Sequence, residues 1–132
     1  MIQTGILNPG VLDLIARVRH TNTLVISDWA FPYWPEIETV DISLTHNIPK
    51  VLDVLELLKT NYKIGKIWQA EEFLATNSAE SIKAFDDAFA GIPDVNVTRL
   101  GHKEFKEMVP SAIGLIRTGD ATPYGNIILE SV

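Results

Sequence analysis

Helix-like and strand-like hydrophobic patterns alternate along this chain. Asn8 and Pro9 are typical of a helix start, because an asparagine side chain caps free amide groups and proline suits the first helical turn. The apolar face of this helix continues to Val18, and the basic residues Arg19 and His20 suit the negative end of its dipole. We therefore predict a first helix that extends to His20, followed by a short strand.

The remaining segments continue this alternation. Strand-like runs occupy residues 23–28, 39–46, 63–70, 94–100, 112–119 and 124–131, with a turn-like segment at 120–123. Helix-like patterns occupy residues 48–59, 77–91 and 102–109, and the segment 29–38, rich in proline and aromatic residues, reads as an irregular loop. This order predicts one domain, residues 1–132, with a three-layer α/β/α fold, a largely parallel sheet and a C-terminal strand pair.

Composition narrows the possible partners and location. Hydrophobic residues make up 46% and charged residues 21% of the 132 positions, as in an ordinary compact protein. No apolar run approaches the roughly 20 residues of a membrane span, and no export signal is visible. The absence of cysteine makes a reducing cytoplasm the simplest location, and a net charge of −6 argues against a nucleic-acid partner. Small neutral molecules or further copies of the chain are the expected partners.

Familiar cofactor and nucleophile motifs are absent from the sequence. It contains neither GxGxxG nor GxxxxGK[ST], no GxSxG elbow and no HExxH pair. The three histidines lie far apart along the chain, so their spacing supports no metal site. We expect a protein that needs neither a cofactor nor a metal.

One acidic residue stands where α/β proteins commonly bind ligands. Asp28 follows the buried-type run Leu24 to Ser27, and ligands of open α/β sheets collect beyond the carboxyl ends of the strands. We hypothesise that His20, before the strand, and Asp28, after it, face one pocket. The simpler alternative is that Asp28 caps a loop.

Four segments, RHTNTLVISD, VDISLTHNIP, GHKEFK and RTGDATPYGNIIL, together resemble the D-ribose pyranase and L-fucose mutarotase family. The resemblance covers essentially the whole chain. It implies an α/β fold in a ring-like homo-oligomer, a decameric ring, with the sugar site near subunit contacts. It also implies cofactor-independent interconversion of the cyclic forms of a free monosaccharide, of ribose or fucose type.

The resemblance assigns roles to individual residues. His20 matches the catalytic histidine, and Asp28 matches the sugar-binding aspartate. His102 matches a second histidine of the ribose branch, and Tyr124 and Asn126 match residues that line the sugar pocket. Without the resemblance, His102 reads as an exposed helix start, and Tyr124 and Asn126 read as turn residues.

Some positions depart from the family pattern. Arg19 replaces a glycine, Asn22 stands where an acidic or small residue is usual, and Trp29 replaces a small side chain beside Asp28. GHKEFK favours a ribose pyranase, whereas the spacing in DWAFP is closer to a fucose mutarotase. A non-catalytic sugar-binding or regulatory protein is a third interpretation, favoured if Trp29 narrows the site.

The aromatic residues of the 29–38 loop suit either sugar stacking or packing. We interpret Glu71 and Glu72 as solvated.

Overall fold

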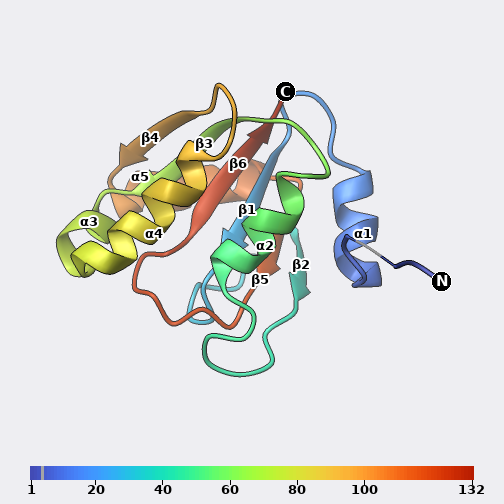
Figure 1. Cartoon of the computed structure of the whole chain (residues 1–132), viewed down its shortest axis with the longest axis horizontal. Helices are drawn as coiled ribbons and strands as arrows, with labels where there is room; N and C mark the ends of the chain where they lie inside the picture. Colours follow the sequence, from blue (N-terminus) through green and yellow to red (C-terminus); the bar gives the residue numbers. More distant parts are fainter. Residues whose placement is uncertain (4) are drawn as a thin grey trace.

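The computed structural model describes residues 1–3 and 5–132. The helices are α1 (Pro9–Ala16), α2 (Val51–Leu58), α3 (Glu72–Thr76), α4 (Ala79–Ala90) and α5 (His102–Met108) (Figure 1). The strands are β1 (Thr23–Ser27), β2 (Glu38–Asp41), β3 (Ile64–Ala70), β4 (Asn96–Leu100), β5 (Gly114–Arg117) and β6 (Ile127–Ser131), and a short 3-10 turn, η1 (Val109–Ser111), follows α5.

Within the described residues, the strands form one six-stranded sheet in the order β2-β5-β1-β6-β3-β4. Neighbouring strands are parallel except at β6, which is antiparallel to both β1 and β3. The predicted α/β fold with a largely parallel sheet and two strands at the C-terminal end is confirmed. The last two strands, however, are the two neighbours of β1 rather than of each other.

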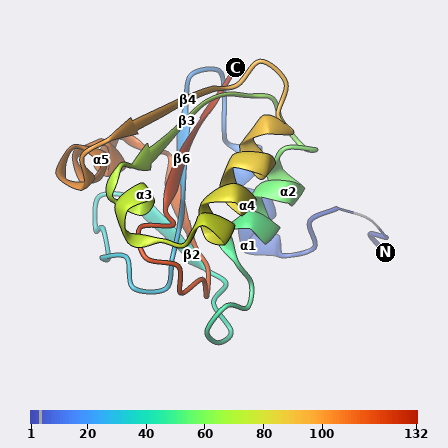
Figure 2. The same cartoon turned by 60° about the vertical axis from the view of Figure 1, so that its left-hand side comes forward.

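Helices cover both faces of the sheet, and this arrangement confirms the three predicted layers (Figure 2). Side chains of α1, α2 and α4 pack with one face of the sheet in the larger core, whose buried residues include Leu14, Leu55 and Phe85. Phe105 of α5 and Val109 of η1 pack on the other face in a smaller core. Burial of such apolar surface is the main stabilising contribution to the fold.

The first helix is shorter than the sequence pattern predicts. It begins at Pro9 as expected, with the Asn8 side chain accepting a hydrogen bond from the amide of Val11 at 3.0 Å. It ends at Ala16, however, so the prediction that it extends to His20 is wrong. His20 lies instead in the exposed turn that leads into β1, next to Thr21, whose φ is +66°. This turn places His20 at the amino end of the strand.

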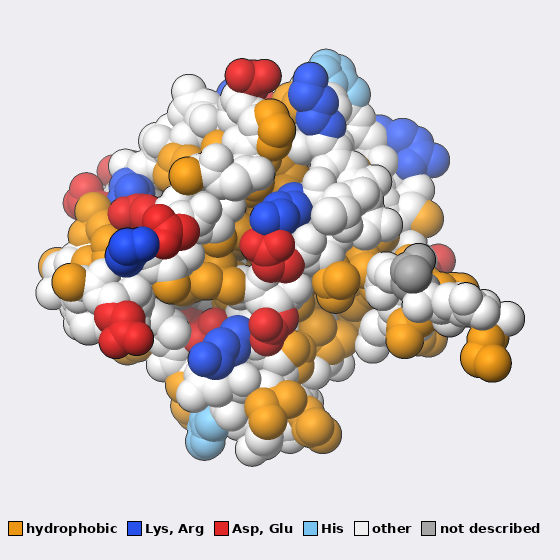
Figure 3. All heavy atoms as spheres, in the orientation of Figure 1, with side chains coloured by type: hydrophobic (Ala, Val, Ile, Leu, Met, Phe, Trp, Pro, Cys, Tyr) orange, Lys and Arg blue, Asp and Glu red, His pale blue; other side chains and the backbone are white. Residues whose placement is uncertain are grey.

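The outer surface above α2 and α4 carries charges of both signs (Figure 3). Exposed ion pairs on this face join Lys59 to Glu56 and Lys83 to Asp87. Such surface pairs stabilise a fold only slightly. No helix in the described part of the chain is long and apolar enough to cross a membrane.

Candidate functional site

A pocket of about 250 Å³ opens at the carboxyl end of β1. Its wall combines three segments that are distant in sequence: the loop after β1, the start of α5 and the loop before β6. The lining residues are Asp28, Ala30, Phe31, Pro32, His102, Pro123, Tyr124 and Asn126. Four of the five residues singled out in the sequence therefore meet in one cavity.

Asp28 and Asn126 form the buried floor of this pocket. Because β6 runs antiparallel to β1, with Ile26 opposite Ile127, the residues that follow β1 meet those that precede β6. The Asn126 side chain accepts a hydrogen bond from the amide of Asp28 at 2.7 Å and donates one to Asp28 Oδ2 at 3.2 Å. Asp28 is 9% exposed and Asn126 is 3% exposed. The pair is thus pre-organised across 98 residues of sequence.

The second carboxylate oxygen of Asp28 is held by its own loop. Asp28 Oδ1 accepts a hydrogen bond from the amide of Ala30 at 3.0 Å. Burial raises the pKa of the Asp28 carboxyl, while the hydrogen bonds from Asn126 and from the loop amides act in the opposite direction. A carboxylate fixed in this way is a strong and oriented acceptor for ligand hydroxyl groups.

His102 enters the pocket from the first position of α5. Both carboxylate oxygens of Glu72 accept the backbone amide of His102, at 3.1 and 2.9 Å. The His102 ring is nearly parallel to that of Phe105, with centroids 6.4 Å apart, and nearly perpendicular to that of Tyr124, with centroids 5.0 Å apart. Burial lowers the pKa of the His102 imidazole, and nearby Lys106 contributes to the same shift. This shift favours the neutral imidazole, which can both donate and accept hydrogen bonds.

Glu72, interpreted from the sequence as a solvated residue, is half-buried and also makes a specific structural contact. Its carboxylate caps α5, and the backbone hydrogen bond from His102 lowers the pKa of the Glu72 carboxyl. Glu72 reaches His102 because β3 and β4 are parallel neighbours, so the segments that follow them lie side by side. The sequence holds no local signal for a cap supplied by a different helix.

The loop that carries Tyr124 is anchored by buried polar contacts. The carboxylate of Asp120, 2% exposed, accepts hydrogen bonds from the amides of Val51 and Thr122, at 2.9 and 2.8 Å. Gly119 packs against residues 45–49, where a Cβ would collide with the Thr45 carbonyl oxygen. Tyr124 itself has φ +56°, a conformation that a non-glycine residue keeps only when its surroundings enforce it. Sequence reasoning missed this support from Asp120.

The aromatic residues of the 29–38 loop have different environments. Phe31 is buried, lines the pocket and packs against Trp34 and Phe105. Trp29 is 51% exposed, and its ring contacts that of His46 at 5.0 Å in a neighbouring depression. The expectation that Trp29 narrows the Asp28 site is therefore not met within one chain.

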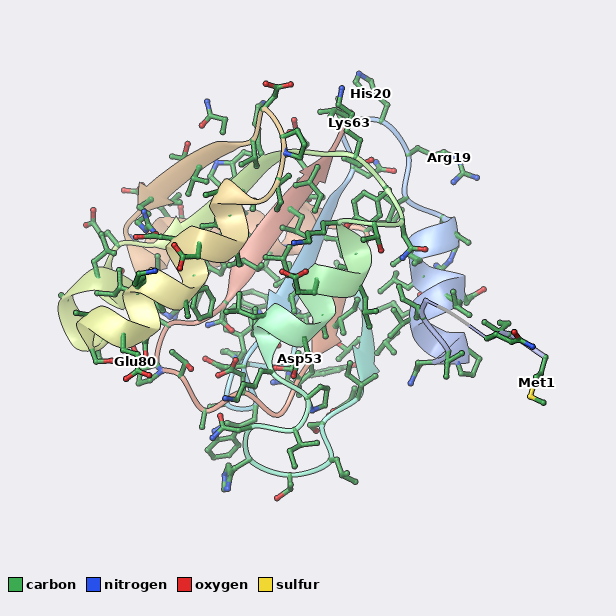
Figure 4. All side chains as sticks on the ribbon, in the orientation of Figure 1. Met1, Arg19, His20, Asp53, Lys63 and Glu80 are labelled. Carbon is green, nitrogen blue, oxygen red and sulfur yellow. The ribbon has the colours of Figure 1, made fainter. Side chains whose placement is uncertain are left out.

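The structure does not bring His20 to this pocket. Figure 4 shows His20 and Lys63 at the top of the view and Asp53, in the first turn of α2, well below them. The turn that holds His20 pairs with β6 through the hydrogen bond from the Thr21 amide to the Ser131 carbonyl oxygen. The five residues of β1, which extend about 16 Å at the usual rise per residue, separate His20 from Asp28. The hypothesis that one chain's own His20 and Asp28 face a common pocket is wrong. In the described residues, no cluster of three or more histidine or acidic side chains suits a metal ion either.

Comparison with known proteins agrees with the fold. The chain matches the RbsD / FucU transport protein family over residues 1–132. It is 40% identical over 133 residues to a D-ribose pyranase of Geobacillus thermodenitrificans, covering 99% of this chain and 96% of that protein. The structure of Bacillus subtilis RbsD complexed with D-ribose superimposes with a TM-score of 0.88 at 32% identity, covering 99% and 97% of the two chains.

A second solved structure shares the fold at much lower sequence identity. A fucose mutarotase from Streptococcus pneumoniae in complex with L-fucose superimposes with a TM-score of 0.69 at 14% identity, covering 94% of this chain and 91% of the other. At that identity the likeness concerns the fold alone. The full-length match to the family model and the 40% identity to a D-ribose pyranase establish that this chain belongs to the RbsD / FucU family.

Proposed function

We propose that this protein is a cofactor-independent monosaccharide mutarotase of the D-ribose pyranase type, located in the cytoplasm. The observation that carries the proposal is the buried Asp28–Asn126 pair on the floor of a small pocket that also holds His102 and Tyr124. Relatives at 32–40% identity over nearly the whole chain are a D-ribose pyranase and a protein solved with D-ribose.

The chemistry needs only proton transfer and orientation. Opening a cyclic hemiacetal moves one proton to the ring oxygen and removes another from the anomeric hydroxyl. Closure through a different hydroxyl then gives the other ring form, so no atom or electron is gained or lost. A side-chain acid or base contributes typically 10²–10⁴-fold to such a step. Asp28, Asn126, His102 and Tyr124 supply the acceptors and donors that would orient the sugar hydroxyls.

We further propose that the catalytic histidine is His20 of a neighbouring copy, within a ring-like homo-oligomer that we expect to be a decamer. His20 is exposed and lies outside the pocket of its own chain. At the pocket end, the exposed apolar residues Trp29, Tyr33 and Leu44 offer a surface for a second copy. A subunit contact that joins the two ends of the sheet would complete the site.

Exchange NMR tests this function directly. Catalytic amounts of the protein, with EDTA present, should accelerate exchange between the pyranose and furanose forms of D-ribose. Asp28→Asn should remove most of the acceleration. Asp87→Asn is the matched control, because it removes an exposed carboxylate that pairs with Lys83 on the surface of α4. A folded wild-type protein that leaves the exchange rates of D-ribose and L-fucose at their buffer values would disprove the proposal.

The same measurement separates the two other candidate functions. Acceleration confined to L-fucose would assign the protein to the fucose mutarotases, which the DWAFP spacing resembles. The absence of His20 from its own chain's pocket is the observation that favours a non-catalytic sugar-binding or regulatory protein. Binding of D-ribose without any acceleration would support that alternative.

A further inference from the structure

The loop of residues 29–32, which contributes part of the pocket wall, has an unusual support. Ala30, Phe31 and Pro32 line the cavity, yet this segment belongs to no helix or strand. Its backbone carbonyls are held by a single side chain. Arg117 Nη1 donates to the carbonyl oxygens of Trp29, at 3.3 Å, and Phe31, and Nη2 donates to that of Pro32 at 3.3 Å.

The position of Arg117 follows from the sheet. It is the last residue of β5, directly opposite Ser27 of β1 on one side and Asp41 of β2 on the other. Its side chain is 12% exposed, and its Nε lies 3.8 Å from Asp41 Oδ2. Arg117 does not line the pocket itself. Its guanidinium therefore lies behind the loop and contacts the loop backbone.

The contacts of Arg117 bear on the Asp28 carboxylate. Asp28 Oδ1 depends on the amide of Ala30, which lies between the carbonyls of Trp29 and Phe31 that Arg117 holds. Planar guanidinium groups present several donors in a fixed geometry, which a lysine ammonium does not reproduce. We call these three contacts of Arg117 the clamp on the 29–32 loop. Without the clamp, the loop is expected to sample other conformations, in which Asp28 loses the oriented amide of Ala30.

We propose that Arg117 is a positioning residue for the substrate-binding carboxylate, acting through the 29–32 loop. The proposal rests on the function proposed above. It predicts that loss of the guanidinium weakens sugar binding and leaves proton transfer on the bound sugar largely unchanged. Substitution of Arg117 should therefore change the dissociation constant of the sugar without changing the rate on the bound sugar, because Arg117 contacts the loop and not the sugar.

The test compares Arg117→Met and Arg117→Lys with Arg17→Met. Arg17 is the matched control, because it ties α1 to the start of β2 through Glu38 and pairs with Asp13, away from the pocket. The first readout is hydrogen exchange of the Ala30 amide, which needs no sugar. We expect this exchange to be at least about ten-fold faster in both Arg117 variants and unchanged in Arg17→Met.

The second readout is the dissociation constant of D-ribose and the exchange rate at saturating D-ribose. We expect the dissociation constant to rise about ten-fold in both Arg117 variants, while the saturated rate stays within about three-fold. Wild-type binding by Arg117→Lys would show that a positive charge alone is sufficient to position the loop, and it would contradict the proposed role of the guanidinium geometry. The lysine variant also keeps the aliphatic stem, so it carries the test if Arg117→Met does not fold.

The two readouts distinguish failure of this inference from failure of the proposed function. A wild-type rate of Ala30 amide exchange in a folded Arg117 variant overturns the positioning role, whatever the activity. A wild-type protein that neither binds nor converts D-ribose overturns the proposed function. In that case the faster Ala30 exchange still establishes the clamp on the loop, and unchanged exchange still refutes it.

Discussion

At its carboxyl end, β1 delivers Asp28 into hydrogen bonds between segments far apart in sequence, whereas at its amino end His20 lies in an exposed turn. Asp28 meets Asn126 across 98 residues, and both side chains are buried. The turn before β1 is held by the backbone contacts of Arg19 with Asn22 and of Thr21 with Ser131, and none of these involves the His20 ring. The Asp28 side chain at the carboxyl end is therefore fixed by the fold, whereas the His20 side chain at the amino end lies on the surface.

This difference fits the proposed division of labour between copies. A buried and pre-organised group suits recognition, since the cost of ordering it is met during folding. An exposed histidine orders only when another surface meets it. The pocket of one chain would thus bind the sugar, and the turn of the next chain would supply the acid or base.

The largest expected effect is that of His20→Ala. If His20 transfers a proton in a neighbour's pocket, the catalysed exchange rate of D-ribose should fall by about 10²-fold or more. The rate of His20→Gln should fall equally, because a glutamine amide donates hydrogen bonds but does not act as an acid or base. Stability should change by less than about 0.5 kcal/mol, since the side chain is exposed. Exchange NMR gives the rate, and thermal unfolding gives the stability. Wild-type turnover in folded His20→Ala would refute the catalytic role.

At the buried end, Asp28→Asn should weaken D-ribose binding by about 10- to 100-fold through loss of a charge-assisted acceptor. Calorimetric titration measures this change. Equal affinity in wild type and variant would mean that the carboxylate does not contact the sugar.

The pH dependence of binding should follow from the raised pKa of Asp28. Burial favours the protonated carboxyl, so binding by the wild type should weaken with falling pH before the ordinary aspartate range, about pH 4, is reached. His102 has its pKa lowered by burial and stays neutral to lower pH than an ordinary histidine. Asp28→Asn should lack the dependence due to the carboxyl. Titrations at several pH values check this, and parallel curves for the two proteins would contradict it.

The smallest effect is expected for Trp29→Ala. The indole lies outside the Asp28 pocket against His46, so the dissociation constants of pentoses and 6-deoxyhexoses should change by less than about three-fold. A selectivity change above about ten-fold would show that Trp29 contacts the sugar, as its place beside Asp28 in the family pattern suggests.

The parts of this molecule that were predictable are those governed by local patterns and strand direction. Parallel strands place their carboxyl ends at one edge, and this arrangement put Asp28 near the start of α5. His102, Tyr124 and Asn126 were identified through the family resemblance, and the fold brings them to the same pocket.

The parts that were missed depend on tertiary contacts between distant segments. Neither the Glu72 cap on His102 nor the Arg117 clamp on the 29–32 loop has a local signature, because each joins segments 30 or more residues apart. The first helix ends at Ala16, before His20, and the chain then forms a turn in which the amide of Thr21 donates to the carbonyl oxygen of Ser131 in β6. The five residues of β1 then separate His20 from Asp28.

Mixing two inactive variants tests the shared site most directly. His20→Ala chains keep an intact pocket, and Asp28→Asn chains keep an intact histidine. When the two are co-expressed and assembled together in equal amounts, about one quarter of the sites would combine an intact pocket with an intact histidine. The account predicts recovery of D-ribose exchange toward about a quarter of the wild-type rate in the mixed assembly, and none when separately purified variants are simply combined without reassembly. Mixed assemblies that stay as inactive as either variant alone would contradict a site shared between copies.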